Sequence, residues 1–230
     1  MQTEILVIGA TGKTGSRVAK RLAERGVPVR HGTRRSEIPF DWENPQTWAA
    51  SMSGIETAYV AYSPDLAVPS AQGVIAEFVK AAETAGLRRV VMLSERNEAR
   101  AQACEQVVKD SSLEWTILQP SWFMQNFSEG GFLDGVMAGE VSAPDSGAKE
   151  PWVDLEDVAD VAAHSSFSAS APVVQANLLF SGYYEIAEKS GAEKSPWGHV
   201  TATRMYDPVD PCNTEKAELW DAGKACLLYT

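Results

Sequence analysis

The sequence predicts an α/β fold, a doubly wound parallel sheet with helices on both faces. Continuous apolar segments alternate along the chain with segments whose apolar residues recur at helical spacing. The first apolar segment runs directly into a glycine-rich turn that opens a helix. A chain of 230 residues is long enough for one such domain with a small appended lobe. Together these features favour a sheet that is buried on both sides.

The first strand and helix have the clearest signals. The run Ile5–Ile8 within residues 4–10 is uninterrupted and apolar, as is typical of a buried parallel strand. Residues 13–25 then repeat apolar positions at helical spacing, and Gly26 follows as a stop signal. The turn between them is therefore a handover from strand to helix.

The next hundred residues repeat this alternation. Further strands are expected at residues 27–33, 38–42, 56–64, 88–95 and 114–120. Helices are expected between them at residues 45–52, 70–85 and 98–109. Strands joined by helices in this way form a parallel sheet with right-handed crossovers.

The pattern changes after Pro120. Residues 121–140 are predicted as an aromatic-rich helical segment, and residues 151–167 as an acidic helix beginning near Asp154. Ligands of open parallel sheets bind outside the carboxyl ends of the strands, so a segment that leaves the last strand is suited to cover a substrate. The signals after it are weaker, with one further helix expected within residues 177–191.

Composition excludes several classes of partner. The net charge of −11 disfavours binding to nucleic acid or to an anionic membrane. No segment has the roughly 18 consecutive apolar residues of a membrane span, and no cleavable leader is evident, so we expect a cytoplasmic protein. Cys104, Cys212 and Cys226 are widely spaced and are expected to be reduced. The three histidines lack ligand spacing, and no metal is predicted.

The glycine-rich turn "GATGKTG" predicts dinucleotide binding. Gly9 permits the tight turn out of the strand, Gly12 lets the backbone approach a pyrophosphate, and Gly15 lets the helix pack on the sheet. The helix that follows directs its positive end at the same point. The polar residues of the turn are expected to contribute contacts: Thr11, Lys13 and Thr14. The alternative, a turn with no ligand, is weakened by this strand–turn–helix context.

The end of the second strand indicates which dinucleotide. An NAD site usually has an acidic residue there to hold the ribose 2′-hydroxyl, whereas this chain has Thr33, Arg34 and Arg35. Two guanidinium groups suit a 2′-phosphate, so NADP(H) is the expected cofactor. The alternative is that both arginines are ordinary surface charges.

With these residues identified, the sequence resembles the NmrA-like group of atypical short-chain dehydrogenase/reductases, in particular its ergot-alkaloid dehydrogenase-like and NAD(P)H quinone oxidoreductase-like members. Five segments carry the resemblance: "GATGKTGSRVAKRL", "FDWENPQTW", "GLRRVVMLSE", "EWTILQPSWFMQNFSE" and "PWVDLEDVADVAA". It covers approximately residues 1–163, which are expected to form a Rossmann-type NADP-binding domain. Residues 164–230 are then a shortened C-terminal substrate or lid segment, without the strand that usually follows the acidic helix.

The resemblance also implies cofactor contacts beyond the glycine turn. It implies that Asp41 and Trp42 lie beside the adenine. Ala61, Tyr62 and Ser63 would border the nicotinamide ribose. Ser94 and the turn containing Pro120, Ser121 and Trp122 would border the nicotinamide and the substrate.

The absence of a Tyr and Lys catalytic pair limits which hydride acceptors the chain can reduce. Ordinary short-chain reductases protonate the alkoxide with a Tyr that has a Lys four residues later, and this sequence contains no Tyr-x-x-x-Lys. Losing such a general acid forfeits roughly 10²–10⁴-fold in rate. An iminium, quinone or conjugated acceptor takes a hydride without that proton, in agreement with the activities of the family.

Candidate residues around the substrate come from the same edge of the sheet. They are Tyr62, Ser94, Arg96, Trp122, Phe123, Gln125, Asn126 and Phe127. Tyr62, Ser94, Trp122 and Asn126 are weak catalytic candidates, whereas Phe123 and Phe127 are expected in the core. Cys104 is expected to be a half-buried helical thiol rather than a nucleophile.

Two other functions stay open at this point. The chain could be a non-catalytic sensor whose affinity for a partner depends on the redox state of NADP(H), or the cofactor could be a vestige in a cyclase or isomerase. The expected partner of an enzyme is a small-molecule substrate, and homo-oligomer formation is left open.

Overall fold

The structure is a computed structural model that describes residues 3–139, 152–167 and 174–178. Its described residues fall into two compact units. One contains residues 3–119, 159–167 and 174–176, and the other contains residues 120–139, 152–158 and 177–178. The first unit holds most of the sheet, and the predicted domain boundary between residues 163 and 164 stays a prediction.

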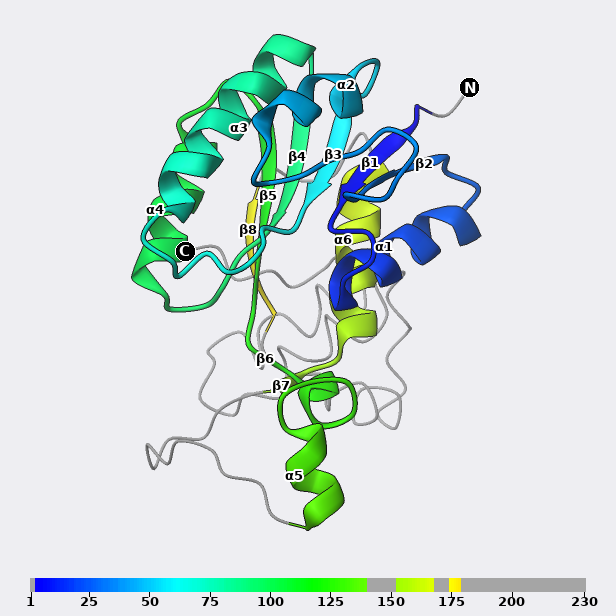
Figure 1. Ribbon diagram of the computed structural model, residues 1–230, viewed down its shortest axis with the longest axis vertical. Coiled ribbons are helices and arrows are strands. Elements are labelled where there is room, and N and C mark those ends of the chain that lie inside the picture. The colour runs from blue at the N-terminus through cyan, green and yellow to red at the C-terminus, as the bar shows by residue number, and fades with distance from the viewer. Residues whose placement is uncertain (1–2, 140–151, 168–173, 179–230) are drawn as a thin grey trace, which may run out of the picture. The chain divides into compact units, whose positions relative to one another are not determined.

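A six-stranded sheet has the order β2-β1-β3-β4-β5-β8 (Figure 1). The strands are β1 (Ile5–Ile8), β2 (Val29–Gly32), β3 (Thr57–Val60), β4 (Arg89–Leu93), β5 (Glu114–Pro120) and β8 (Val174–Leu178). β1 pairs in parallel with both β2 and β3, and the parallel pairing continues from β3 to β4 and from β4 to β5. The carboxyl ends of these five strands therefore meet at one edge, and the strand order reverses beside β1.

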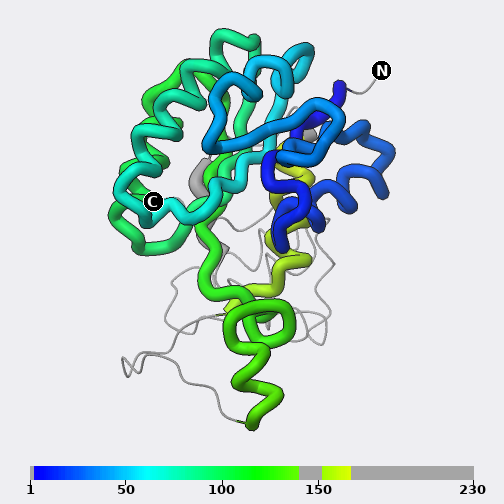
Figure 2. Tube along the Cα trace, viewed as in Figure 1, coloured from blue at the N-terminus to red at the C-terminus, as the bar shows by residue number. Residues whose placement is uncertain are grey.

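Helices cover both faces of the sheet, as predicted (Figures 1 and 2). They are α1 (Lys13–Glu24), α2 (Trp48–Met52), α3 (Ala71–Ala85), α4 (Ala99–Lys109) and α6 (Leu155–Phe167), with a 3-10 turn η1 (Pro45–Thr47) before α2. α3 and α4 lie together on one face. α1 lies on the opposite face beside α6, where Asp160 accepts hydrogen bonds from Arg21 and Arg25.

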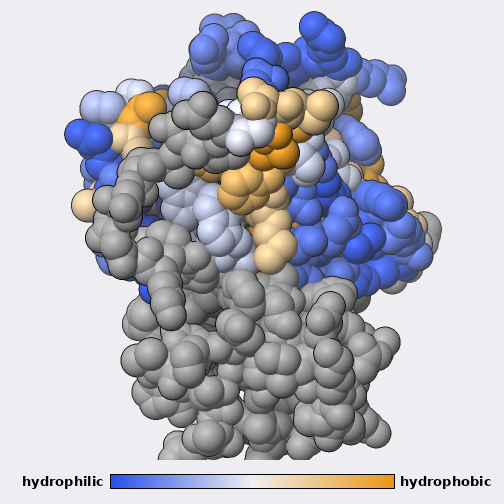
Figure 3. All heavy atoms as spheres, turned by 90° about the horizontal axis from the view of Figure 1, so that it is seen from below, coloured by the Kyte–Doolittle hydropathy of each residue, from blue (hydrophilic) through white to orange (hydrophobic). Residues whose placement is uncertain are grey.

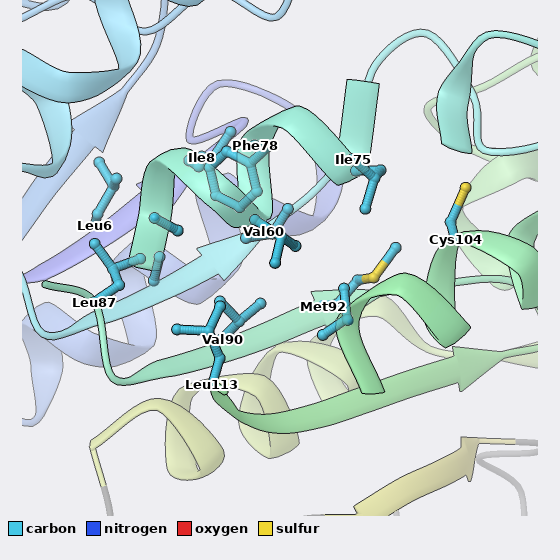
Figure 4. Close-up of a cluster of buried hydrophobic side chains, with 14 of the residues drawn as sticks. Leu6, Ile8, Val60, Ile75, Phe78, Leu87, Val90, Met92, Cys104 and Leu113 are labelled. Carbon is cyan, nitrogen blue, oxygen red and sulfur yellow. The ribbon is translucent and has the colours of Figure 1, made fainter. Parts of the chain in front are cut away.

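The main core lies between the sheet and the α3–α4 face. Ile8, Val60 and Met92 from three adjacent strands lie close to Ile75 and Phe78 of α3 (Figure 4). All four residues of β1 are buried, because their side chains face helices on both sides alternately. This explains the continuous apolar run that predicted the strand.

The second unit is small and rich in aromatic residues. A two-stranded parallel ladder joins β6 (Trp122–Phe123) to β7 (Trp152–Val153). The 3-10 turn η2 (Met124–Phe127) and the short helix α5 (Leu133–Ala138) complete it. The prediction of one helical segment over residues 121–140 was therefore wrong at its start, where β6 is extended.

Two further expectations about the sheet were wrong. Residues 38–42 form no strand, because the segment leaves the sheet and buries Phe40 beneath α3 instead. Residues 174–178 do form a strand, β8, where none was expected after the acidic helix. Of the helix expected within residues 177–191, the first two residues belong to β8 and the rest lies outside the described residues. Cys212, Cys226 and His199 also lie outside them.

Candidate functional site

The turn from β1 to α1 is held by hydrogen bonds between backbone groups and exposes main chain at the start of α1. Gly9 has a φ of +79°, which non-glycine residues rarely adopt, and its N–H donates to the Gly32 carbonyl at 3.0 Å. The Gly12 N–H donates to the Gly9 carbonyl at 2.8 Å, and Gly12 then begins α1 without a side-chain cap. The first turn of α1 contains no acidic residue. This arrangement leaves a helix N-terminus bordered by bare main chain, as an anion requires.

Gly15 fixes how closely α1 approaches β1. A Cβ on Gly15 would lie 2.2 Å from the Gly9 carbonyl oxygen and 2.7 Å from its carbon. Backbone atoms cannot yield at such distances, so only glycine allows this packing. Gly32 has a milder constraint, since its Cβ would lie 3.1 Å from the Ile8 Cα, a tight contact but not an overlap. Sequence reasoning missed Gly32, although its position at the end of β2 beside the glycine turn was the available signal.

The loop after β2 is held by Thr33. Its carbonyl accepts the N–H groups of Ser36 and Phe40, and its hydroxyl lies 2.8 Å from the Ser36 hydroxyl and accepts the Arg35 N–H at 3.3 Å. Thr33 therefore organises the loop itself. The side chains of Arg34 and Arg35 are exposed, and neither has an ion pair with any residue that the structure describes.

Asp41 is hydrogen-bonded to α2, and Trp42 to the end of β3. The Trp42 indole N–H donates to the Ala61 carbonyl at 3.2 Å, and the Trp48 indole N–H donates to the Asp41 carbonyl at 2.7 Å. The Trp42 ring contacts those of Phe40 at 4.9 Å and Tyr62 at 5.0 Å between centroids. This aromatic cluster holds residues 41–42 although they form no strand.

The ends of β1 and β3 also meet here. A Cβ on Gly9 would lie 3.2 Å from that of Ala61, which shows that the glycine turn and the end of β3 are in contact. Tyr62 and Ser63 follow Ala61, with Tyr62 partly buried against Trp42 and Ser63 exposed. Burial raises the pKa of the Tyr62 hydroxyl. The structure thus brings together the glycine turn, Trp42 and residues 61–62.

Ser94, just after β4, is 2% exposed and donates its hydroxyl to Glu105 of α4 at 2.5 Å. Gln119 of β5 donates to the same carboxylate oxygen at 2.6 Å. A hydroxyl committed in this way favours a structural role for Ser94. Sequence reasoning missed Glu105, because a buried acidic residue has no sequence signature within a helix.

Glu95 is a second acidic group that sequence reasoning missed. It follows Ser94 at the carboxyl edge of the sheet, near Asp65 from the loop after β3. Burial, followed by the charge of Asp65 and a hydrogen bond to it, raises the pKa of Glu95 to about 7. Arg96, the next residue, is exposed.

Cys104 is more deeply buried than expected. Its side chain lies in the core of the α4 face, and burial raises the pKa of the thiol to about 11. The thiol is therefore protonated at neutral pH and unsuited to act as a nucleophile.

The aromatic candidates belong to the second unit. Trp122 is 45% exposed, and its ring contacts Phe132 and Trp152 at centroid distances of 6.1 and 5.5 Å. Phe127 packs on the same two rings but is exposed, so the expectation that it lies in the core was wrong. Phe123 is partly buried.

Gln125 has a structural role in that unit. Its amide donates to Asp154 at 2.8 Å and accepts the Leu155 N–H at 2.9 Å, which fastens η2 to the start of α6. Asn126 is partly buried, and its carbonyl accepts the Phe132 N–H. Pro120, Ser121, Trp122 and Asn126 stay predicted contacts, since they lie in the second unit.

Seen from below, the described surface carries a central strip of hydrophobic residues beside a hydrophilic area (Figure 3). Among residues 3–139, 152–167 and 174–178, no three His, Cys, Asp or Glu side chains gather as a metal site would require. The helices within these ranges are all too short or too polar to cross a membrane.

Comparisons with known proteins agree with this geometry. A family model described as NAD(P)H-binding matches residues 9–167. Similar curated proteins include a festuclavine dehydrogenase from Aspergillus fumigatus, 29% identical over 181 residues, and an NAD(P)H azoreductase from Xenophilus azovorans, 30% identical over 180 residues. In both cases the match covers 69% of this chain and 61% of the relative. A (4-alkanoyl-5-oxo-2,5-dihydrofuran-3-yl)methyl phosphate reductase from Streptomyces griseus is 35% identical over 184 residues, again covering 69% and 61%.

The chain spans about three-fifths of the length of the curated relatives that it matches. Among solved structures, the Citrobacter sp. triphenylmethane reductase complexed with NADP(H) has a TM-score of 0.61 and 20% identity, covering 82% of this chain and 76% of that one. MoeE5 in complex with UDP-glucose and NAD has a TM-score of 0.63 and 17% identity, covering 82% of each chain. These likenesses establish the Rossmann-like fold.

Proposed function

This chain belongs to the NAD(P)H-binding family, and from that premise we propose that it is an NADP(H)-dependent oxidoreductase of the atypical short-chain type. It delivers a hydride to a small iminium, quinone or conjugated acceptor. The observation that carries the proposal is the glycine turn, where Gly15 can pack against Gly9 only without a side chain. Main chain and helix N-terminus are thereby kept open to a diphosphate.

The residues of the first unit fit a dinucleotide from one end to the other. The turn from Gly9 to Gly15 would hold the diphosphate, and Asp41 and Trp42 would lie beside the adenine. Tyr62 and the end of β3 would border the nicotinamide ribose. When bound, the cofactor supplies the hydride, and the chain supplies its orientation and a site with restricted access to water.

Arg34 and Arg35 support the choice of NADP(H). Both guanidinium groups are exposed just after β2, where a 2′-phosphate would lie in this fold, and no carboxylate takes the position that holds an unphosphorylated ribose. Each is free of an ion pair within the described part of the chain, so neither would lose a partner on binding phosphate.

We expect R34A/R35A to raise the dissociation constant of NADPH at least 10-fold, as measured by calorimetry. The dissociation constant of NADH should stay within 2-fold of its value for the unchanged protein. Arg88→Ala is the matched control, because Arg88 is equally exposed but lies before β4, at the opposite edge of the sheet. Equal losses for both dinucleotides, or no loss for either, would refute the assignment of the 2′-phosphate to this loop.

The acceptor class follows from the missing general acid. The sequence has no Tyr-x-x-x-Lys, so an acceptor that becomes a stable product on receiving a hydride is favoured. The names of the relatives support an oxidoreductase with acceptors of this kind: they are a festuclavine dehydrogenase, an NAD(P)H azoreductase and a (4-alkanoyl-5-oxo-2,5-dihydrofuran-3-yl)methyl phosphate reductase.

The activity test mixes the purified chain with NADPH and a panel of iminium ions, quinones and conjugated ketones. Loss of absorbance at the reduced-nicotinamide band, with matching product formation, is the expected result.

An unreactive panel in the presence of proven NADPH binding would favour the second candidate, a non-catalytic sensor, which the same missing acid supports. A sensor must bind NADPH and NADP⁺ with different affinities, since equal affinities shift no equilibrium. Product formed with the cofactor omitted would indicate a cyclase or isomerase.

A further inference from the structure

A buried carboxylate joins the ends of two strands at the carboxyl edge of the sheet. Glu105 of α4 is 1% exposed. One of its oxygens accepts hydrogen bonds from the Ser94 hydroxyl at 2.5 Å and from the Gln119 amide at 2.6 Å, and the other lies 3.4 Å from the Lys109 ammonium. All three donors lie within the first unit.

The two strand residues are next to each other in the sheet. Ser94 directly follows β4 and Gln119 lies near the end of β5, and the Ser94 N–H donates to the Leu118 carbonyl at 2.8 Å. The Glu105 carboxylate therefore reaches from the helix layer into the sheet and ties β4 to β5 where both strands end. These ends lie on the far side of β1 from β2, whose end carries Arg34 and Arg35.

A buried carboxylate at this position does not maximise the stability of the fold. Removing a carboxylate from water is costly, and an apolar residue of similar volume commonly stabilises a core at least as well. Charged hydrogen bonds are, however, short and directional, so they fix the positions of their partners better than apolar contacts do. The arrangement therefore gives up some stability but fixes the relative positions of Ser94 and Gln119 at the edge of the sheet.

We propose that Glu105 is a positioning residue for the nicotinamide half of the cofactor. It fixes the ends of β4 and β5, where the nicotinamide of a dinucleotide that extends across the carboxyl edge of the sheet from β2 would lie. Glu105 would do so without touching the cofactor itself. The inference rests on the proposed function. It states that Glu105 affects the orientation of the nicotinamide half and not the binding of the adenosine half.

The test compares two ligands in Glu105→Gln, which keeps the shape of the side chain and removes its charge. Adenosine 2′,5′-bisphosphate, which lacks the nicotinamide, should bind within 2-fold of the unchanged protein. NADPH should bind at least 10-fold more weakly, and the fluorescence of the bound nicotinamide should shift toward that of free NADPH. Gln106→Ala is the matched control, since Gln106 is the exposed neighbour of Glu105 on α4 and reaches only Asp110.

The outcomes separate the inference from its premise. Equal weakening of both ligands, or of neither, in a folded Glu105→Gln protein would overturn the positioning role while NADPH binding by the unchanged protein stands. Failure of the unchanged protein to bind NADPH would overturn the proposed function and this inference with it. Should Glu105→Gln not fold, Gln119→Leu removes one tie from the strand side and must show the same selective loss of NADPH affinity.

Discussion

Single residues in the glycine turn have separate physical roles. Gly9 is required by its backbone angle, whereas Gly15 is required by the space between α1 and β1. A sequence motif presents these glycines as equivalent, but substitution should distinguish them.

Gly15→Ala is expected to be the more damaging change to packing. Its new Cβ would overlap the Gly9 carbonyl, so α1 must shift, lowering the free energy of unfolding by about 1–3 kcal/mol and abolishing NADPH binding. Gly73→Ala is the control, because Gly73 lies in α3 with no atom near its missing Cβ, and alanine there should add about 0.5–1 kcal/mol. Urea denaturation measures both, and an unaltered midpoint for Gly15→Ala would contradict the close packing of α1 on the end of β1.

Glu95 makes stability depend on pH. Its pKa rises from an ordinary 4.5 to about 7 on folding, chiefly through burial. Ionisation of the Glu95 carboxyl is less favourable in the folded protein than in the unfolded chain. The contribution of Glu95 to the free energy of unfolding is therefore fully present below pH 4.5 and is lost as the pH rises to about 7. Glu95→Gln does not ionise, and it should exceed the unchanged protein in unfolding free energy by about 1 kcal/mol at pH 8, allowing for solvent screening, and by almost nothing at pH 4.

The comparison must be made as a difference between the two proteins. Burial lowers the pKa of His164 to about 4, so protonation of His164 removes stability as the pH falls below 6.5 in both proteins. That contribution cancels in the difference. A difference that is constant from pH 4 to pH 8 would show that Glu95 has no raised pKa.

At the scale of elements, regular segments could be predicted and irregular ones could not. β1, α1, α3 and α4 were recognisable because each repeats its apolar residues at one period over a full element. Residues 38–42 were misread as a strand because Phe40 and Trp42 are typical strand residues, yet here they fill a gap beside α2 and α3. β8 was missed because Gln175 and Asn177 interrupt its apolar residues, so it lacks the continuous apolar run that identified β1.

The candidate site divides in the same way. The glycine turn and the loop after β2 follow from local sequence, because each lies within one short continuous stretch, residues 9–15 and 33–35. Glu105 and Glu95 were invisible, since their environment comes from strands that are adjacent only in the folded sheet. Sequence reasoning therefore singled out the glycine turn and the arginine loop, and it missed Glu95 and Glu105.

Asp160 links α6 to α1 through two arginines. Asp160 is 19% exposed and accepts hydrogen bonds from Arg21 at 2.9 Å and Arg25 at 3.2 Å. Asp160→Asn is expected to lower the unfolding free energy by about 1–2 kcal/mol, because it removes a charge from two partly buried partners. Glu114→Gln is the comparison: it breaks a pair with Arg89 at 2.6 Å, but Glu114 is 52% exposed, so less than about 1 kcal/mol is expected. Equal costs in urea denaturation would mean that burial does not strengthen the α1–α6 pair.

For the molecule as a whole, charge and cofactor binding are linked. The net charge is −11, yet residues 1–35 carry eight Lys or Arg against two Glu. Of these, Lys13 lies at the turn and Arg34 and Arg35 lie in the loop after β2, whereas Arg21, Arg25 and Arg30 form ion pairs with Asp160 and Glu4. An anionic dinucleotide would therefore meet positive charge at this edge of an otherwise acidic protein. The attraction is electrostatic and should weaken as salt is added.

Cofactor binding should therefore stabilise the fold in a way that depends on both the 2′-phosphate and the salt concentration. NADPH at 100 times its dissociation constant adds about 2.7 kcal/mol by mass action, which corresponds to a rise of about 5–10 °C in the Tm of a protein of this size. NADH at the same concentration should give a smaller rise, because it lacks the 2′-phosphate that Arg34 and Arg35 are proposed to bind. R34A/R35A should reduce the NADPH rise to the NADH value, and added salt should do the same to the unchanged protein. A thermal shift that is identical for the two dinucleotides at low salt would mean that the positive region attracts the diphosphate alone, and the cofactor would then be NAD(H) as readily as NADP(H).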